Sequence, residues 1–361
     1  MLASELGKFL ALRGHSVHFI TLGVPYRLRG EFHENIRFHT VEANSYPVFE
    51  HAPLNMALAA KMREVAVAES LDVLHVHYAV PHAISAYLAA QMLLPKRLPI
   101  VTTLHGTDIT LVGKDKTYAP VVTFSINESD AITAVSSNLR EETYASFDIR
   151  KEIEVIYNFV DVRRFGKKPI DAFRKVIAPH GERILMHASN FRKIKRVADV
   201  IYVFNKIRKK IPSKLLLVGD GPERNMCEEL ARELGITDDI RFVGKQQDME
   251  DIFAIADLFL LPSEYESFGL AALEAMAGGA PVITTNAGGL PEIITNGENG
   301  FMSAVGDVED MSRNALAILK DEATFEKFRK NAKATAQCFD IMSIIPQYED
   351  LYQRCMEAVK A

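Results

Sequence analysis

Several features that would assign a sequence to a protein class at once are missing or rare in this chain. Its 361 residues include no tryptophan and only three cysteines. Cys227, Cys338 and Cys355 are odd in number and lie far apart, without the spacing of a zinc site. This pattern argues against a disulfide framework and predicts a reduced, cytosolic protein without a metal centre.

Neither sign of charge dominates, and long apolar runs are missing too. The chain carries 42 basic and 47 acidic side chains, a formal net charge of −5, which provides no field to attract nucleic acid. No apolar run approaches the roughly 18 residues that span a bilayer, and no signal peptide precedes the first predicted helix. We therefore expect a soluble, cytoplasmic protein without nucleic-acid or integral membrane contact. A peripheral membrane contact stays open.

The sequence does contain apolar segments of strand length that alternate with segments of helical period. Hydrophobic residues make up 48% of the chain, and its length predicts two domains. Strands are predicted in two series, at 17–20, 73–76, 100–104, 131–135 and 153–156, and at 184–188, 215–218, 240–243, 258–261 and 282–284. Near-continuous apolar strands separated by helices predict an α/β fold with parallel sheets covered on both faces.

A polar stretch containing Gly166, Lys167, Lys168 and Pro169 separates the two series. It predicts an N-terminal Rossmann-like domain over 1–163 and a C-terminal one over 164–340. A final helix within 341–361 is expected to pack back on the N-terminal domain. A doubly wound domain normally opens with a strand and a glycine-rich turn before its first helix. Here Met1 lies almost at that helix, so the first strand and turn are expected to be missing, or the domain has an unusual edge.

The strongest local signal runs from Glu266 to Glu274 (ESFGLAALE). Gly269 stands where a loop turns into a helix, so backbone N–H groups there can face an anion. Eight residues of helix span about 12 Å, which exceeds the about 5–5.5 Å or 6.5–9.5 Å between the carboxyl groups of retaining or inverting glycoside hydrolases. We therefore expect the two glutamates to hold two parts of one extended ligand, such as a sugar and a ribose. Two glutamates on a solvated helix face are the alternative.

A second signal, 189–196 (SNFRKIKR), directly follows a predicted strand. Ligands of open parallel sheets bind at the carboxyl ends of strands, so Arg192 and Lys195 are placed to neutralise a diphosphate and stabilise its charge as it leaves. The alternative is a solvated basic loop. The turns at Gly219 (GDGPE) and Gly288 (GGLPE) allow close backbone approach, and turn chemistry explains them about as well as ligand binding does.

In the first domain, polar side chains follow two predicted strands. His75, His77 and Tyr78 come at the end of one, and Thr103 and His105 at the end of the next. His105, beside a glycine, is well placed to touch a substrate hydroxyl or carboxylate. His75 and His77 have the spacing of metal ligands on a strand, but no third ligand is apparent, and we expect them to be buried and hydrogen-bonded.

Together these residues resemble the retaining GT-B glycosyltransferases of family 4, whose fold is two Rossmann-like domains with parallel sheets that face each other across a cleft. The E-x7-E element, the basic loop and the GDGPE turn are shared across that family. The segments 75–82 (HVHYAVPH), 102–110 (TTLHGTDIT) and 189–196 are more specific. They are similar to members that glycosylate L-malate in bacillithiol biosynthesis. The resemblance covers residues 5–352.

The resemblance implies transfer of N-acetylglucosamine from UDP-N-acetylglucosamine to the hydroxyl of L-malate, with retention at the anomeric carbon and release of UDP. Glu274 would hold the ribose and Glu266 the donor sugar. Donor contacts are expected from Asn190, Arg192, Lys195, Gly219, Glu266, Ser267, Phe268, Gly269, Leu270 and Glu274. Acceptor contacts are expected from Tyr78, Thr103, His105 and Asn190, and catalytic roles from His105, Glu266, Arg192 and Lys195.

The resemblance also implies that no metal and no cofactor is required, because the two cations do the electrostatic work, and it makes a homodimer plausible. In this family a first strand and a glycine-rich loop precede the segment that matches 2–7. We therefore expect about 15–20 further residues upstream, the length of one strand and its turn. The alternatives are a family-4 transferase with another acceptor and a shortened sugar-nucleotide-binding protein without turnover.

Overall fold

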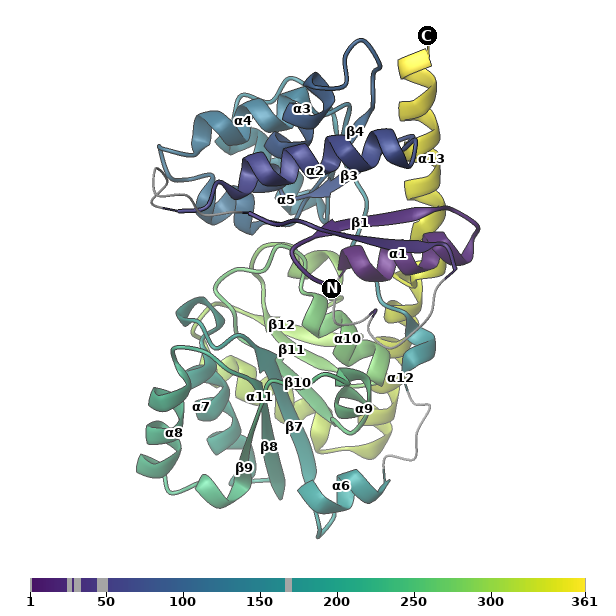
Figure 1. Cartoon of the computed structure of the whole chain (residues 1–361). Helices are drawn as coiled ribbons and strands as arrows, with labels where there is room; N and C mark the ends of the chain where they lie inside the picture. The colour runs from purple at the N-terminus through teal and green to yellow at the C-terminus, as the bar shows by residue number, and fades with distance from the viewer. Residues whose placement is uncertain (1, 25–27, 29–33, 44–50, 166–170, 361) are drawn as a thin grey trace. The chain divides into compact units, whose positions relative to one another are not determined.

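The computed structural model describes residues 2–24, 28, 34–43, 51–165 and 171–360 of the chain. They divide into two compact units, one formed by Met1–Asn158 together with Ile341–Ala361 and the other by Phe159–Asp340. We call them unit 1 and unit 2. Both are α/β units with parallel strands (Figure 1). The polar stretch at 166–169 lies outside the described residues.

Unit 2 contains one six-stranded sheet in the order β12-β11-β10-β7-β8-β9, and all its neighbouring strands pair in parallel. The strands are β7 (Arg183–Ser189), β8 (Ser213–Gly219), β9 (Ile240–Gly244), β10 (Leu258–Leu261), β11 (Val282–Thr285) and β12 (Gly300–Ser303). Because the strand order reverses beside β7, the loops that follow β7 and β10 leave the sheet next to each other, as at the switch point of doubly wound folds.

Helices cover both faces of this sheet (Figure 1). Leu215 and Leu217 of β8 point into a core cluster with one set of helices, and the intervening Leu216 is equally buried. The helices of that cluster are α7 (Val197–Arg208), α8 (Arg224–Glu233), α11 (Val308–Leu319) and α12 (Glu322–Cys338). On the other face lie α9 (Met249–Ala254) and α10 (Leu270–Gly278), and Phe253 of α9 packs on Phe259 of β10. Burial on both faces explains the continuous apolar strands.

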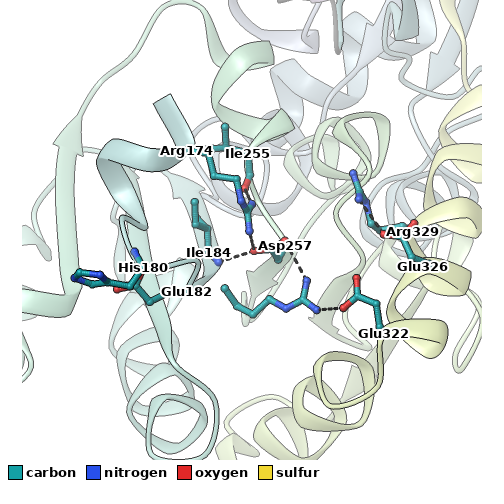
Figure 2. A network of polar contacts seen from close by, with 10 residues as sticks. Arg174, His180, Glu182, Ile184, Ile255, Asp257, Glu322, Glu326 and Arg329 are labelled. Carbon is teal, nitrogen blue, oxygen red and sulfur yellow. Dashed lines mark hydrogen bonds and ion pairs between the residues drawn. The ribbon is translucent and has the colours of Figure 1, made fainter. Parts of the chain in front are cut away.

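A buried carboxylate organises the amino edge of the sheet, where its strands begin (Figure 2). Asp257, just before β10, accepts the Ile184 N–H of β7 at 2.7 Å and Arg174 Nη2 at 2.6 Å. Arg174, on α6 (Asp171–Ile177), also donates to the Ile255 carbonyl at 2.7 Å. Arg183 Nη1 lies 3.6 Å from Asp257 Oδ1, and Arg183 Nη2 forms an ion pair with Glu322 of α12. The carboxylate thus ties two strands and a helix together.

Unit 1 has two separate groups of paired strands in the described residues. β1 (Val17–Thr21) pairs with β2 (Ile36–Thr40), and a four-stranded sheet has the order β3-β4-β5-β6. The four strands are β3 (Leu74–His77), β4 (Ile100–Leu104), β5 (Ala131–Ala134) and β6 (Ile153–Val155). The helices before the linker are α1 (Leu2–Leu12), α2 (Leu54–Ala68), α3 (Ile84–Gln91), α4 (Ala119–Glu128) and α5 (Ser137–Ser146). α2 and α3 share a core cluster with β3 and β4.

The last helix, α13 (Ile341–Lys360), belongs to unit 1 although unit 2 precedes it in the chain (Figure 1, yellow). Glu349 of α13 accepts a hydrogen bond from Arg13 Nε at 2.7 Å. Arg354 of α13 forms a bidentate ion pair with Glu154 of β6 at 2.9 and 2.8 Å. The Tyr352 hydroxyl of α13 lies within hydrogen-bond distance, 2.7 Å, of His75 Nδ1 on β3. Among the described helices, none has the length and apolar character needed to cross a membrane.

Candidate active site

The carboxyl edge of the unit 2 sheet brings two sequence-predicted residues into direct contact. Lys195 lies in the loop after β7, within a short 3-10 turn (Lys193–Lys195), and Glu266 lies in the loop after β10. Lys195 Nζ donates to Glu266 Oε1 at 2.6 Å, and Ser263 Oγ donates to the same oxygen at 2.8 Å. The side chains of this ion pair are 21% and 14% exposed, so both are accessible to a ligand.

A chain of hydrogen bonds from inside the sheet holds the basic loop. The Phe191 N–H donates to Ser189 Oγ at 3.2 Å, which lies 2.8 Å from His187 Nε2, while His187 Nδ1 lies 2.8 Å from the Leu260 carbonyl. The carbonyl only accepts, so Nδ1 carries the proton and Nε2 accepts from Ser189. Burial lowers the pKa of His187 to about 4, which keeps the ring in this neutral form. Arg192 and Asn190, in the same loop, are exposed.

Two glycines let the loops of this edge approach each other. A Cβ on Gly219, at φ +120°, would lie 1.8 Å from the Ser189 carbonyl oxygen. A Cβ on Gly288, at φ +62°, would lie 2.0 Å from the Glu266 carbonyl oxygen, which also accepts the Gly289 N–H at 2.8 Å. Packing alone therefore requires glycine at both turns, and the donor contact expected of Gly219 stays a prediction.

The loop from Glu266 leads directly into α10. The helix begins at Leu270 after Gly269, which provides no side-chain cap, and Glu274 lies part-buried in its second turn. Phe268 is 1% exposed and packs edge-on against Phe339, and the donor contact expected of this residue stays a prediction. Ser267 and Leu270 are part-buried beside it. The start of α10 is thus a helix N-terminus next to the Lys195–Glu266 pair, a combination suited to a phosphate or a similar anion.

In unit 1 the carboxyl ends of β3 and β4 bring Tyr78 and His105 together. The Tyr78 ring is 36% exposed and its centroid lies 4.9 Å from that of His105. His105 Nε2 lies 2.8 Å from His77 Nδ1. Burial lowers the pKa of His105 to about 4, so its imidazole is neutral at pH 7 and can share a hydrogen bond with a substrate hydroxyl.

Thr103 is buried, unlike Tyr78, with which it was predicted to contact the acceptor. Its side chain is 1% exposed, and its hydroxyl lies 2.8 Å from His75 Nε2 and 2.7 Å from Thr133 Oγ1. His75 Nδ1 in turn lies 2.7 Å from the Tyr352 hydroxyl of α13. His75 and His77 are hydrogen-bonded, as expected. Thr103 thus links β4 to β3 and β5 through side-chain hydrogen bonds, and an acceptor contact by this residue stays a prediction.

Sequence reasoning did not assign a role to Asp108, which joins the two loops of this edge. Its carboxylate, 1% exposed, accepts the backbone N–H groups of Ala79 at 3.0 Å, Gly106 at 3.0 Å and His105 at 3.3 Å. Burial raises the pKa of Asp108, and these N–H groups oppose that rise. Its place inside the TTLHGTDIT segment was a visible signal. Tyr352 had none, since 277 positions separate it from His75.

Comparisons with known proteins identify the family. The family model "Glycosyltransferase Family 4" matches residues 2–164, and the model "Glycosyl transferases group 1" matches residues 170–335. The chain is 47% identical over 354 residues to N-acetyl-alpha-D-glucosaminyl L-malate synthase of Bacillus anthracis, a match that covers 98% of this chain and 92% of that protein. The chain is a family-4 glycosyltransferase. The predicted family is thus confirmed.

Solved structures place the transferase in the GT-B fold class. A glycosyltransferase from Rickettsia africae superposes with a TM-score of 0.80 at 21% identity and covers 98% of this chain and 94% of that one. Anabaena Alr3699/HepE in complex with UDP and glucose gives a TM-score of 0.82 at 22% identity, with 98% and 95% covered. The predicted α/β fold class with parallel sheets is confirmed.

Proposed function

We propose that this glycosyltransferase transfers N-acetylglucosamine from UDP-N-acetylglucosamine to the hydroxyl of L-malate, with retention at the anomeric carbon. The observation that carries the proposal is the 47% identity, over nearly the full length of both chains, to a protein named for that product. The segments 75–82, 102–110 and 189–196 support it, because each lies at the carboxyl end of a strand, where ligands of open parallel sheets bind.

The donor half of the proposal rests on unit 2. A diphosphate carries negative charge that grows on its leaving oxygen, and Lys195 and Arg192 provide two cations for it. Lys195 Nζ donates to Glu266 Oε1 at 2.6 Å. We expect Lys195 to turn toward the diphosphate in the complex, so that the Glu266 carboxylate can accept from the sugar hydroxyls. Glu274, on the adjacent helix, is expected to accept from the ribose hydroxyls.

The acceptor half rests on unit 1, and the low pKa of His105 limits its role. A group with a pKa of about 4 is a weak base at pH 7, so we expect His105 to orient the malate hydroxyl rather than to remove its proton. The bond from the anomeric carbon to the diphosphate oxygen breaks as the bond to the malate oxygen forms on the same face. The malate hydroxyl proton then passes to the departing UDP. No metal and no cofactor is proposed for this reaction, while the homodimer and the cytoplasmic location remain predictions.

The direct test is to incubate the purified chain with UDP-N-acetylglucosamine and measure UDP release with and without L-malate. We expect release only with malate, a product with the mass of N-acetylglucosaminyl malate, an α-anomeric NMR signal and no loss of rate in EDTA. Succinate, which has both carboxylates but lacks the hydroxyl, is the matched control acceptor and should give no product. Release with a lipid or sugar acceptor instead of malate would support the alternative acceptor class. Binding without release would identify a sugar-nucleotide-binding protein.

A further inference from the structure

A third group of polar side chains lies in unit 1 and takes no part in the proposed reaction. His18 is on β1, His39 is on β2, and Glu69 is the residue that ends α2. One ligand atom from each lies within 4.8 Å of the other two, and this is the one such group of three found in the described part of the chain. Three separate elements contribute one residue each.

The two imidazoles already have nearly the geometry of ligands on one ion. His18 Nδ1 and His39 Nε2 are 3.0 Å apart, and the rings are close to parallel. Two nitrogen ligands at about 2.0–2.1 Å from a tetrahedral zinc ion lie about 3.4 Å apart, so a shift of a few tenths of an ångström admits an ion. Glu69 is exposed, so its carboxylate can turn toward the pair.

The surroundings of His18 orient it for this role. Ser16 Oγ lies 3.1 Å from His18 Nε2, on the ring nitrogen that does not face His39. A hydrogen bond at the far nitrogen fixes the ring orientation of most metal-binding histidines. Arg37 Nη1 donates to the same serine oxygen at 3.5 Å. Its positive charge opposes a cation there, and the Glu69 carboxylate offsets it.

We propose that His18, His39 and Glu69 bind one divalent transition-metal ion of the zinc type, with water in the fourth position. The role is structural. In the described residues β1 and β2 pair only with each other, and Ile20 of β1 packs against the core cluster that contains α2. An ion held by β1, β2 and the end of α2 fastens this pair to the core cluster that α2 shares with β3 and β4. Cation binding here is independent of the transferase reaction.

The test uses the full chain, freed of metal with a chelator and then dialysed. Titration calorimetry with Zn²⁺ should give one bound equivalent per chain, and Co²⁺ should give the absorption bands of tetrahedral coordination. Zn²⁺ should raise the thermal unfolding midpoint, because a ligand that binds the folded state stabilises it. The variants are H18A, H39A and E69Q, with S16A as the orienting variant and H180A, at an exposed histidine of unit 2, as the matched control.

We expect H18A and H39A to lose binding and the rise in the midpoint, and E69Q, at an exposed position, to weaken binding without loss of fold. S16A should weaken binding by about 10-fold, the lower end of the range for outer partners of metal ligands, while H180A should bind like the wild type. Circular dichroism separates loss of binding from loss of fold. Zn²⁺ affinity that is equal in the wild type and E69Q and S16A, or Co²⁺ spectra without tetrahedral bands, overturns the proposal. Transferase activity measured on the metal-free chain keeps this outcome separate from that of the proposed function.

Discussion

The sheet of unit 2 carries ion pairs at both of its edges, and the two edges use them differently. At the amino edge the Asp257 side chain is 8% exposed, and its carboxylate accepts a backbone N–H of β7 as well as Arg174. At the carboxyl edge the Lys195–Glu266 pair joins two loops and remains partly exposed. Both edges pair a carboxylate with a cation, but only the carboxylate of the amino edge also accepts a backbone hydrogen bond from a strand of the sheet.

This difference follows from the geometry of parallel strands. At the carboxyl edge, loops lead from strands into helix N-termini, which attract anions. A cation there can exchange a carboxylate for a bound diphosphate. At the amino edge a buried carboxylate that lost one partner would leave charges and N–H groups unpaired. We therefore expect substitutions at the carboxyl edge to affect turnover and those at the amino edge to affect stability.

The largest expected effect comes from removing both cations of the carboxyl edge. R192A/K195A should lower kcat/KM for the donor by about 10³-fold or more, since one such electrostatic donor is worth about 10²–10³ in rate. The thermal midpoint should stay close to that of the wild type, because Ser263 still holds Glu266. Steady-state kinetics and calorimetric unfolding check the two outcomes. K193A, which removes an exposed lysine between the two, is the matched control. Turnover that survives in the double variant would contradict the proposed donor site.

Breaking the amino edge should have the opposite signature. D257A leaves Arg174 and the Ile184 N–H without their buried partner and should reduce the free energy of unfolding by about 3–5 kcal/mol. Turnover per folded molecule, measured well below the midpoint, should be unchanged. E322Q removes the exposed partner of Arg183, 68% exposed, and should cost less than about 1 kcal/mol. A stable but inactive D257A variant would contradict this division between the edges.

Acidification should lower the stability of the protein by less than D257A does, through the buried His187 at the carboxyl edge. The folded state lowers the pKa of His187 from 6.5 to about 4, so between these values the unfolded chain binds more protons. The stabilisation is thus fully present above pH 6.5 and is lost as the pH falls toward 4, by about 3 kcal/mol at roughly 1.4 kcal/mol per pKa unit. Urea unfolding between pH 7.5 and 5 should have a shallower pH slope in H187Q than in the wild type. Equal slopes in H187Q and the wild type would rule this contribution out.

Unit 1 adds a further contrast, because its carboxyl edge is built from neutral rings rather than from ion pairs. Burial lowers the pKa of His75 to about 3 and that of His105 to about 4. The neutral rings hydrogen-bond to Tyr352 and His77, and Asp108 fixes the backbone beneath them. Neutral rings can share hydrogen bonds with an acceptor hydroxyl, whereas the cations of the unit 2 edge suit a donor that departs as a diphosphate.

Sequence patterns predicted the strands of both sheets closely where they are apolar. Buried strands such as β8, with its run of leucines, matched within two residues at each end, because burial on both faces makes such runs unmistakable. Two strands were not predicted, β2 and β12, because each is short and neither is a continuous apolar run. Arg192 and Lys195 were predicted as site residues because they follow a predicted strand, and Glu266 because of the E-x7-E element. His187 and Ser263, which contact these loops, carried no local signal.

The sequence by itself determined the fold class, the two series of strands and the residue types at their ends, because periodicity and turn chemistry are local properties. Only the tertiary structure decided which of these residues meet. Lys195 and Glu266 are 71 positions apart and His75 and Tyr352 are 277 apart, and the His18–His39–Glu69 group joins two strands and a helix end. Such contacts depend on strand order and helix packing, which no short stretch of sequence encodes.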